Sequence, residues 1–147
     1  MTVNRLSIAS FIIFSLLIST SNSQWAPSGS MIDIPAMNNC SKTGGEVASA
    51  NPDGIFRCPS RAKVIDAQVS DASHFYVVQA YGQMATRKVS KTLADCWAAH
   101  QLAGAPNGPH YVQQWIRHWK MYGITNATYG RPEQRIANVR SCCACGV

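Results

Sequence analysis

The sequence predicts an α+β domain in which a small antiparallel β-sheet packs against two helices and three disulfides staple the fold. β-Branched and aromatic residues concentrate between residues 54 and 82, which indicates strands. Two apolar stripes of helical period follow, near residues 91–103 and 109–122. The six cysteines form an even set in a chain whose first residues are typical of an exported protein, so we expect them to be oxidised.

The first 23 residues have the three parts of a signal peptide. A positively charged start at Met1–Arg5 precedes an apolar run of 13 residues, 6–18, and Ser21–Ser23 supplies the small residues of a cleavage site. A membrane anchor is the alternative, but this run is shorter than the about 20 residues that a spanning helix needs. We therefore expect a signal peptide at 1–23, which is removed, and a single secreted, extracellular domain at 24–147 without a transmembrane span.

Positive charge gathers in the second half of the chain. With histidine neutral, residues 24–86 carry a net charge of −1 and residues 87–147 a net charge of +6. This asymmetry favours a basic surface that faces an extracellular polyanion, such as a cell surface, a glycan or RNA. The alternative is that the charge only keeps a secreted protein soluble. We expect the protein to be a monomer.

Cysteines are spread unevenly along the chain. Three stand singly and three cluster at the end: Cys40, Cys58 and Cys96, then Cys142, Cys143 and Cys145. Bridges within the cluster would be strained, because the two Cβ atoms of a disulfide must approach to about 3.8 Å. We therefore expect each clustered cysteine to bond one upstream cysteine, which leaves six connectivities. A zinc site is the alternative, but the chain lacks its usual repeated C-x2-4-C spacing, and we expect no metal and no cofactor.

The first half of the secreted domain should form an arm and a sheet. Residues 24–39 contain two prolines and no clear period, which indicates an extended arm. A short strand is expected at 54–58, ended by Pro59. Alternating β-branched and aromatic residues at 63–69 and 74–81, with turn formers between them, predict an antiparallel hairpin.

Two helices should follow the sheet. Thr92 and Asp95 have the spacing of a capping box at the start of the helix at 91–103, and Gly104 suits its end. Residues 109–122 carry a wide apolar stripe and form the second helix. The short loop between the two predicts an antiparallel pair.

The last segment has two interpretations. Arg131-Pro132-Glu133 can open a short helix, because proline suits the first turn of a helix. Residues 135–140 can instead form a last strand that returns to the sheet. The sequence leaves both open.

Two asparagines begin N-x-S/T sequons, Asn39 and Asn126. In a secreted protein such asparagines are candidate glycosylation sites. We favour Asn126, because it follows directly after the end of a predicted helix.

The second predicted helix carries the candidate binding face. At about 100° per residue, its polar side chains point away from the apolar stripe. The residues of this face are His110, Gln114, Arg117, His118 and Lys120. Basic residues interleaved with aromatic ones suit a polyanion or a single-stranded nucleic acid, because phosphates meet cations and bases stack on rings. The alternative is a solvated face whose aromatic neighbours form the core.

The histidines suggest a second possible function. The protein would be a ribonuclease-like hydrolase that uses one histidine as base and another as acid. The catalytic candidates are His118, His110 and His74. His110 and His118 lie about 12 Å apart along one helix, too far to serve one phosphate directly, so a working pair needs His74 beside one of them. We place His100 in the core, because it shares the apolar side of the first helix.

The segment Trp115–Gly123, WIRHWKMYG, resembles the second active-site segment of the T2-type ribonucleases, W-x-x-H-E-W-x-K-H-G. His118 matches the first histidine of that pattern. The glutamate that follows it is missing, and Tyr122 stands where the second histidine belongs. The family's other segment, H-G-L-W-P, is absent. The resemblance covers about nine residues and implies metal-independent cleavage of RNA, but we do not assign the chain to the family on it.

Other chemistries lack their motifs. The chain has no G-x-S-x-G, no glycine-rich phosphate loop and no H-E-x-x-H. Its seven carboxylates are not grouped as a glycosidase pair, and a free cysteine nucleophile would break the even cysteine count. We therefore expect a non-enzymatic protein of effector, toxin or matrix type that binds an anionic or macromolecular partner. The ribonuclease-like hydrolase is the alternative.

Overall fold

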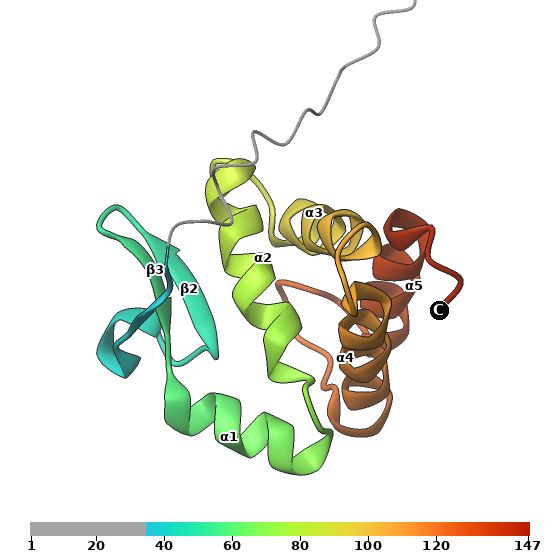
Figure 1. Ribbon diagram of the computed structural model, residues 1–147, viewed down its shortest axis with the longest axis horizontal. Coiled ribbons are helices and arrows are strands. Elements are labelled where there is room, and N and C mark those ends of the chain that lie inside the picture. Colours follow the sequence, from blue (N-terminus) through green and yellow to red (C-terminus); the bar gives the residue numbers. More distant parts are fainter. Residues whose placement is uncertain (1–34) are drawn as a thin grey trace, which may run out of the picture.

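The computed structural model describes residues 35–147 (Figure 1). The predicted signal peptide and residues 24–34 of the predicted arm lie outside the described residues. Within the described range, no helix has both the length and the apolar character that crossing a membrane requires. The α+β class and the presence of three disulfides are confirmed.

Three short strands precede five helices along the described chain. The strands are β1 (Met37–Asn38), β2 (Ala48–Asn51) and β3 (Gly54–Arg57), with a 3-10 helix, η1 (Cys40–Thr43), between β1 and β2. The helices are α1 (Pro59–Gln68), α2 (Ser73–Ala85), α3 (Lys91–Ala103), α4 (Gly108–Tyr122) and α5 (Pro132–Cys143). Helix α2 stands in the middle, with the sheet on one side and α3, α4 and α5 on the other (Figure 1). The core is accordingly divided into a smaller cluster towards the sheet and a larger one among the helices.

The sheet is mixed, not antiparallel as predicted. Strand β3, which confirms the strand expected at 54–58, lies in the middle; β2 pairs with it antiparallel and β1 pairs with it parallel. A tight turn joins β2 to β3, and Gly54 takes a φ of 132° there, a region that favours glycine. Since η1 and β2 bring the chain back before β3 begins, β1 and β3 run in the same direction.

The predicted hairpin at 63–69 and 74–81 is wrong, because both segments are helical. Helix α1 begins with Pro59, whose missing N–H would have no partner in the first turn anyway, and Ala62 is its only buried residue. Helix α2 buries residues at helical spacing, among them Phe75, Val78, Gln79 and Gly82. Burial of α2 on two sides, against the sheet and against the other helices, therefore outweighs the β-propensity of its valines and aromatic residues.

Helix α2 is held at its start and lies close to α3. The Asp66 carboxylate accepts hydrogen bonds from the Ser73 backbone N–H at 2.8 Å and from its hydroxyl at 2.7 Å, which satisfies a donor at the helix start. A Cβ atom at Gly82 would lie 2.6 Å from the carbonyl oxygen of Ala94. The two helix backbones can approach this closely because residue 82 has no side chain.

The two predicted helices at 91–103 and 109–122 are present as α3 and α4. Ser90 caps α3 by accepting from the backbone N–H groups of Thr92 and Leu93, so Asp95 lies inside the helix and not in a capping box. The last segment, which the sequence allowed to be either a helix or a strand, forms helix α5. The helix against the sheet is α2, and α3 and α4 pack on its other side.

The disulfides differ from the predicted connectivities. Cys40 bonds Cys58, Cys96 bonds Cys142, and Cys143 bonds Cys145. Only one clustered cysteine therefore reaches upstream, and none of the six connectivities holds. Ala144 adopts a left-handed φ of 49°, and this turn sets the Cα atoms of the flanking cysteines 5.1 Å apart, within the usual range for a bridge.

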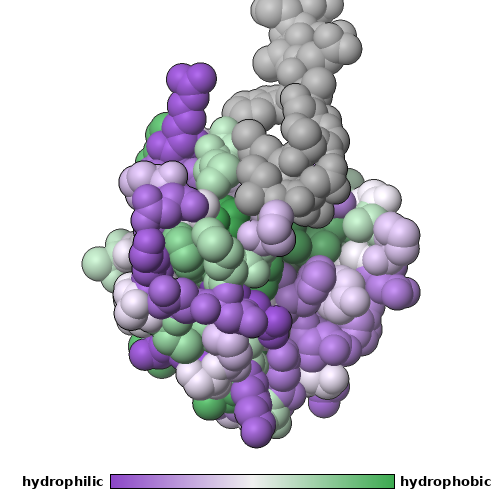
Figure 2. All heavy atoms as spheres, turned by 60° about the vertical axis from the view of Figure 1, so that its left-hand side comes forward, coloured by the Kyte–Doolittle hydropathy of each residue, from purple (hydrophilic) through white to green (hydrophobic). Residues whose placement is uncertain are grey.

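The side of the molecule that carries the sheet is largely hydrophilic, with a hydrophobic area in the middle of the face shown in Figure 2. Large apolar side chains reach solvent at several positions in the described chain. They are Met37, Val64, Val89, Leu93, Met121, Tyr122 and Ile124. Single exposed apolar residues are ordinary, so only those beside a hollow bear on function.

Candidate functional site

The structure divides the predicted binding face of α4. Arg117 and Lys120 are exposed, and so is His110. Gln114 is half-buried. His118 is buried, with 6% of its surface exposed, so its place on a binding face is wrong. It lies at the edge of the polar face, where α1 and α2 cover it.

The ring of His118 forms its contacts inside the protein. Its Nε2 lies 2.9 Å from Oε1 of Gln68, and its Nδ1 lies 3.3 Å from the Tyr76 hydroxyl. The neutral ring therefore donates from Nε2 to the amide oxygen and accepts at Nδ1. Burial lowers the pKa of His118, and the nearby Asp66 opposes that shift. Because both ring nitrogens have partners, the histidine that carries the T2-ribonuclease resemblance lacks a free nitrogen for a substrate.

An exposed basic groove lies between α4 and α5. It has a volume of about 330 Å³ and is lined by Gln113, Gln114, Ile116, Arg117, Lys120, Arg140 and Val147. The three cations are exposed, and none of them forms an ion pair within the described residues. No aspartate or glutamate is in this described lining; Glu133 lines a neighbouring hollow that shares Lys120 and Arg140. We call these residues the basic groove.

Arg140 was not predicted as a binding residue, because the sequence allowed two secondary structures for the last segment. The signal was present, since Ile136, Val139 and Cys143 recur at helical spacing and are all buried in α5. A helix assigned there would have added one more cation beside the predicted face.

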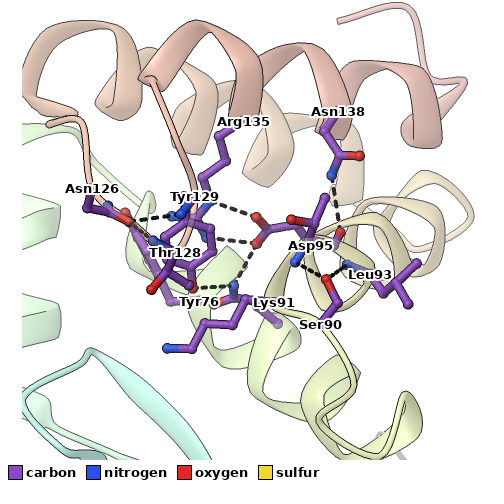
Figure 3. Close-up of polar contacts among 12 residues, drawn as sticks. Tyr76, Ser90, Lys91, Leu93, Asp95, Asn126, Thr128, Tyr129, Arg135 and Asn138 are labelled. Atoms are coloured by element: carbon purple, nitrogen blue, oxygen red, sulfur yellow. Dashed lines mark hydrogen bonds and ion pairs between the residues drawn. The ribbon is translucent and has the colours of Figure 1, made fainter.

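A buried ion pair fixes α5 against α3, and with it the position of the groove. Arg135 reaches from α5 towards α3 and donates from Nε to Oδ2 of Asp95 at 2.6 Å and from Nη2 to Oδ1 at 2.7 Å (Figure 3). The exposed fractions are 0% for Asp95 and 4% for Arg135. Two parallel, charge-assisted hydrogen bonds define orientation as well as distance. The Cys96–Cys142 disulfide joins the same two helices covalently.

Polar groups and aromatic rings complete this ion pair. Gln79 Nε2 donates to Oδ1 of Asp95 at 2.6 Å and to the Tyr129 hydroxyl at 3.1 Å. The Arg135 guanidinium lies 3.5 Å from the ring centroid of Tyr129 and 4.3 Å from that of Trp119. Burial raises the pKa of Asp95, while Arg135 and Gln79 oppose the shift. The two charges therefore balance each other, and Tyr129 and Trp119 cover the guanidinium.

A polar hollow of about 440 Å³ lies beside the starts of α2 and α4. Its lining is Ala36, Asn38, Arg57, Asp66, Asp71, Ser73, His74, Val77 and Tyr111. The rings of His74 and His110 both contact Tyr111, with centroid distances of 3.9 Å and 5.6 Å. His110 Nε2 lies 3.0 Å from Oδ2 of Asp71. Of the three predicted catalytic histidines, the structure thus gathers two around one ring and leaves His118 elsewhere.

The chemistry of this polar hollow combines a base with a cation. Burial lowers the pKa of His74 and Arg57 adds to that shift, whereas Asp71 and Asp66 oppose it. Nε of Arg57 is buried and has no hydrogen-bond partner among the described residues. A neutral imidazole can take a proton, and a guanidinium N–H can bind an anionic oxygen.

His100 is exposed on α3, so its predicted place in the core is wrong. The buried stripe of that helix runs through Ala94, Ala98 and Leu102, four residues apart. Among the described residues, no group of three or more histidine, cysteine, aspartate and glutamate side chains is arranged to hold a metal ion.

The two sequon asparagines use their side-chain oxygens locally. Oδ1 of Asn39 accepts from the Ser41 backbone N–H at 3.1 Å. Oδ1 of Asn126 accepts from the backbone N–H of Thr128 at 3.0 Å (Figure 3). Neither contact uses Nδ2, the atom to which a glycan is attached, and glycosylation at both positions stays a prediction.

No protein-family model, curated protein or solved structure matches this chain. Its function is therefore inferred from its own residues.

Proposed function

We propose that this protein acts outside the cell by binding an anionic polymer in the basic groove, without catalysis at that site. The observation that carries the proposal is the set of three exposed cations, Arg117, Lys120 and Arg140, around a hollow with no carboxylate side chain in its described lining. Unpaired cations favour a polyanion, because its sulfate or phosphate groups replace bound counterions, which are released. The disulfides are compatible with an oxidising, extracellular setting.

The groove favours a sulfated glycan over single-stranded RNA. Its described lining has no aromatic side chain, whereas sites for single-stranded nucleic acid stack bases on exposed rings. Arg117 and Arg140 present planar guanidinium groups that can bind two oxygens of one sulfate. The amides of Gln113 and Gln114 can donate to and accept from sugar hydroxyls.

Retention on immobilised heparin, a sulfated polysaccharide, tests the proposal. We expect the protein to bind at low salt and to elute as ionic strength rises, because exposed charges are screened. The Arg117→Glu/Lys120→Glu double variant should elute at much lower salt, and Arg140→Glu should fall between the two. Single-stranded RNA should compete less well than soluble heparin.

The matched control reverses two exposed cations outside the groove, Lys63 and Arg87, and gives the same net charge as the first double variant. The Lys63→Glu/Arg87→Glu protein should elute close to the unaltered protein. Equal losses in the two double variants would mean that overall charge alone drives retention, and the groove would lose its role.

A second candidate function, the ribonuclease-like hydrolase, is favoured by one observation: His74 and His110 both contact Tyr111, beside Arg57. In this proposal one histidine removes the proton from a ribose 2′-hydroxyl and the other protonates the leaving oxygen. Asp71 would orient His110, and Arg57 would bind the phosphate.

Purified protein incubated with RNA in a chelator, between about pH 5 and about pH 8, tests this second candidate. Cleavage should disappear in His74→Ala and in His110→Ala and persist in His100→Ala, which alters an exposed histidine on α3. Absence of cleavage removes the hydrolase and leaves the heparin result untouched.

A further inference from the structure

A cleft of about 770 Å³ lies apart from both of these sites. Residues of α1 line it, including Arg61 and Val64, together with Ile124 and Tyr129 from the connection between α4 and α5. It shares no lining residue with the basic groove. Its volume falls within the range of about 300–1,000 Å³ that is usual for small-molecule pockets.

Two hydrogen-bond donors converge in this cleft, the Tyr129 hydroxyl and the Arg135 guanidinium, beside the indole of Trp119. Trp119 is buried, with 8% of its surface exposed, and its indole lies next to the Tyr76 hydroxyl, which also lines the cleft. The Tyr129 hydroxyl accepts from Gln79, so its own O–H remains available to donate. Arg135 uses Nε and Nη2 on Asp95, and no described residue accepts from its Nη1.

These three groups are neighbours. The rings of Trp119 and Tyr129 have centroids 6.1 Å apart, and the Arg135 guanidinium lies over both rings. Burial raises the pKa of Tyr129, so its hydroxyl keeps the proton near neutral pH. Donors without acceptors in a buried place are costly, and an anionic oxygen there would satisfy them.

Apolar side chains line the same cleft and are solvent-exposed. Val64 is 59% exposed and Ile124 is 72% exposed, and Ile65 also lines the cleft. Two exposed aliphatic residues beside one opening offer an apolar surface to a ligand that leaves the cleft towards solvent.

The charge of the lining favours an anion. Glu46, the acidic residue of the described lining, is paired with Lys91, and Arg135 is paired with Asp95. Arg61 is exposed and forms no ion pair within the described residues. One positive charge is therefore left over, which a single carboxylate would balance.

We propose that this cleft binds a small monoanionic amphiphile, a carboxylate with an apolar body. The carboxylate oxygens accept from Nη1 of Arg135 and from the Tyr129 hydroxyl, with the Trp119 ring beside them. The body lies along Ile65 and extends past Val64 and Ile124 to solvent. Arg61 attracts the anion electrostatically.

Calorimetric titration of the full chain with decanoate, decanol and decyltrimethylammonium tests the proposal, with tryptophan fluorescence as a second readout. Decanoate should bind and change the fluorescence, because Trp119 lies at its carboxylate. Decanol should bind at least about tenfold more weakly, because it lacks the charge that strengthens the hydrogen bonds. The cationic amphiphile should not bind.

Tyr129→Phe keeps the ring and removes the hydroxyl, and should weaken decanoate binding about tenfold. Tyr122→Phe, an exposed tyrosine outside the cleft, is the matched control and should bind as the unaltered protein does. Ile124→Asp alters an exposed position, so folding should survive while decanoate binding is lost. The proposal would be overturned if decanoate did not bind, if all three amphiphiles bound equally, or if the two tyrosine variants had equal affinities for decanoate. These outcomes do not depend on the result of the heparin experiment.

Discussion

The Asp95 carboxylate on α3 and the Arg135 guanidinium on α5, 40 residues apart in the chain, meet inside the protein with both of their side chains buried. The other ion pairs of the described residues have partly exposed partners. Next to Asp95, Cys96 is bonded to Cys142 of α5. Helices α3 and α5 are thus joined by charge and by a covalent bond at neighbouring positions, which gives the basic groove a fixed wall.

Breaking this ion pair should cost a large part of the stability of the domain. Arg135→Leu leaves the Asp95 carboxylate buried without its partner, and we expect a loss of about 3–5 kcal/mol in the free energy of unfolding. Urea denaturation followed by tryptophan fluorescence measures it. The Asp95→Leu/Arg135→Leu double variant should lose less than Arg135→Leu alone, because no charge is left buried. A double variant that loses the sum of both single losses would contradict this account.

The half-exposed ion pair of Lys91 with Glu46 is the internal control for that experiment. Glu46→Gln should change the free energy of unfolding by less than about 1 kcal/mol, since solvent screens such pairs.

The losses of stability on removing single disulfides should rank by the length of chain that each disulfide closes. The bridge Cys96–Cys142 spans 46 residues and Cys143–Cys145 spans 2. In the chain-entropy model, replacing the first pair with serine costs about 4 kcal/mol and replacing the second about 1.2 kcal/mol. Thermal unfolding of the two double-serine variants compares them, and the reverse order would contradict the assignment.

Tryptic mapping without reduction checks the same connectivity directly. Cleavage after Arg140 should leave the C-terminal peptide attached to the peptide of Cys96 and to no other. A link from this peptide to Cys40 or Cys58 would contradict the observed pairing and favour one of the six connectivities expected from the sequence.

Alanine at Gly82 should push α2 and α3 apart. Its Cβ would lie 2.6 Å from the backbone oxygen of Ala94, which cannot rotate away, and we expect a loss of about 1–3 kcal/mol. Gly104→Ala is the matched control, because a Cβ there meets nothing within 4 Å. Denaturant unfolding should separate the two variants; equal stabilities would mean that the helices can shift without cost.

The free energy of unfolding should decrease in mildly acidic solution because His118 becomes protonated on unfolding. Since burial lowers the pKa of this histidine, the unfolded chain binds its proton at a higher pH than the folded chain does. The contribution to stability is complete above the ordinary histidine pKa of about 6.5 and declines as the pH falls below it. The pKa of His74 is lowered too and acts in the same direction.

Thermal unfolding between about pH 7 and about pH 5 measures this effect. His118→Gln should show a shallower decline than the unaltered protein, whereas His100→Gln, at an exposed position, should keep the original slope. An unchanged slope in His118→Gln would contradict the buried, neutral state of that ring.

Local signals predicted α3 and α4 well, because their apolar stripes, the glycines at their ends and the starting proline of α4 act within a few residues. The same reasoning failed for α1 and α2. Their valines and aromatic residues favour strands locally, but the tertiary fold buries α2 on two sides, against the sheet and against the other helices.

The candidate site shows the same division. Arg117 and Lys120 could be found from helical spacing, since they point away from the buried stripe of α4. His118 could not be placed, because Gln68 and Tyr76 come from other helices to cover it. Arg140 was missed because its segment had two interpretations.

The sequence by itself determined the α+β class, the presence of three disulfides and the helices α3 and α4, because composition and short-range spacing are sufficient for these. Only the tertiary structure decided which cysteines meet, which histidines are buried and which cations share a groove. Those relationships join residues that are dozens of positions apart, such as Asp95 and Arg135. They depend on how the helices pack, and no local pattern in the chain specifies that packing.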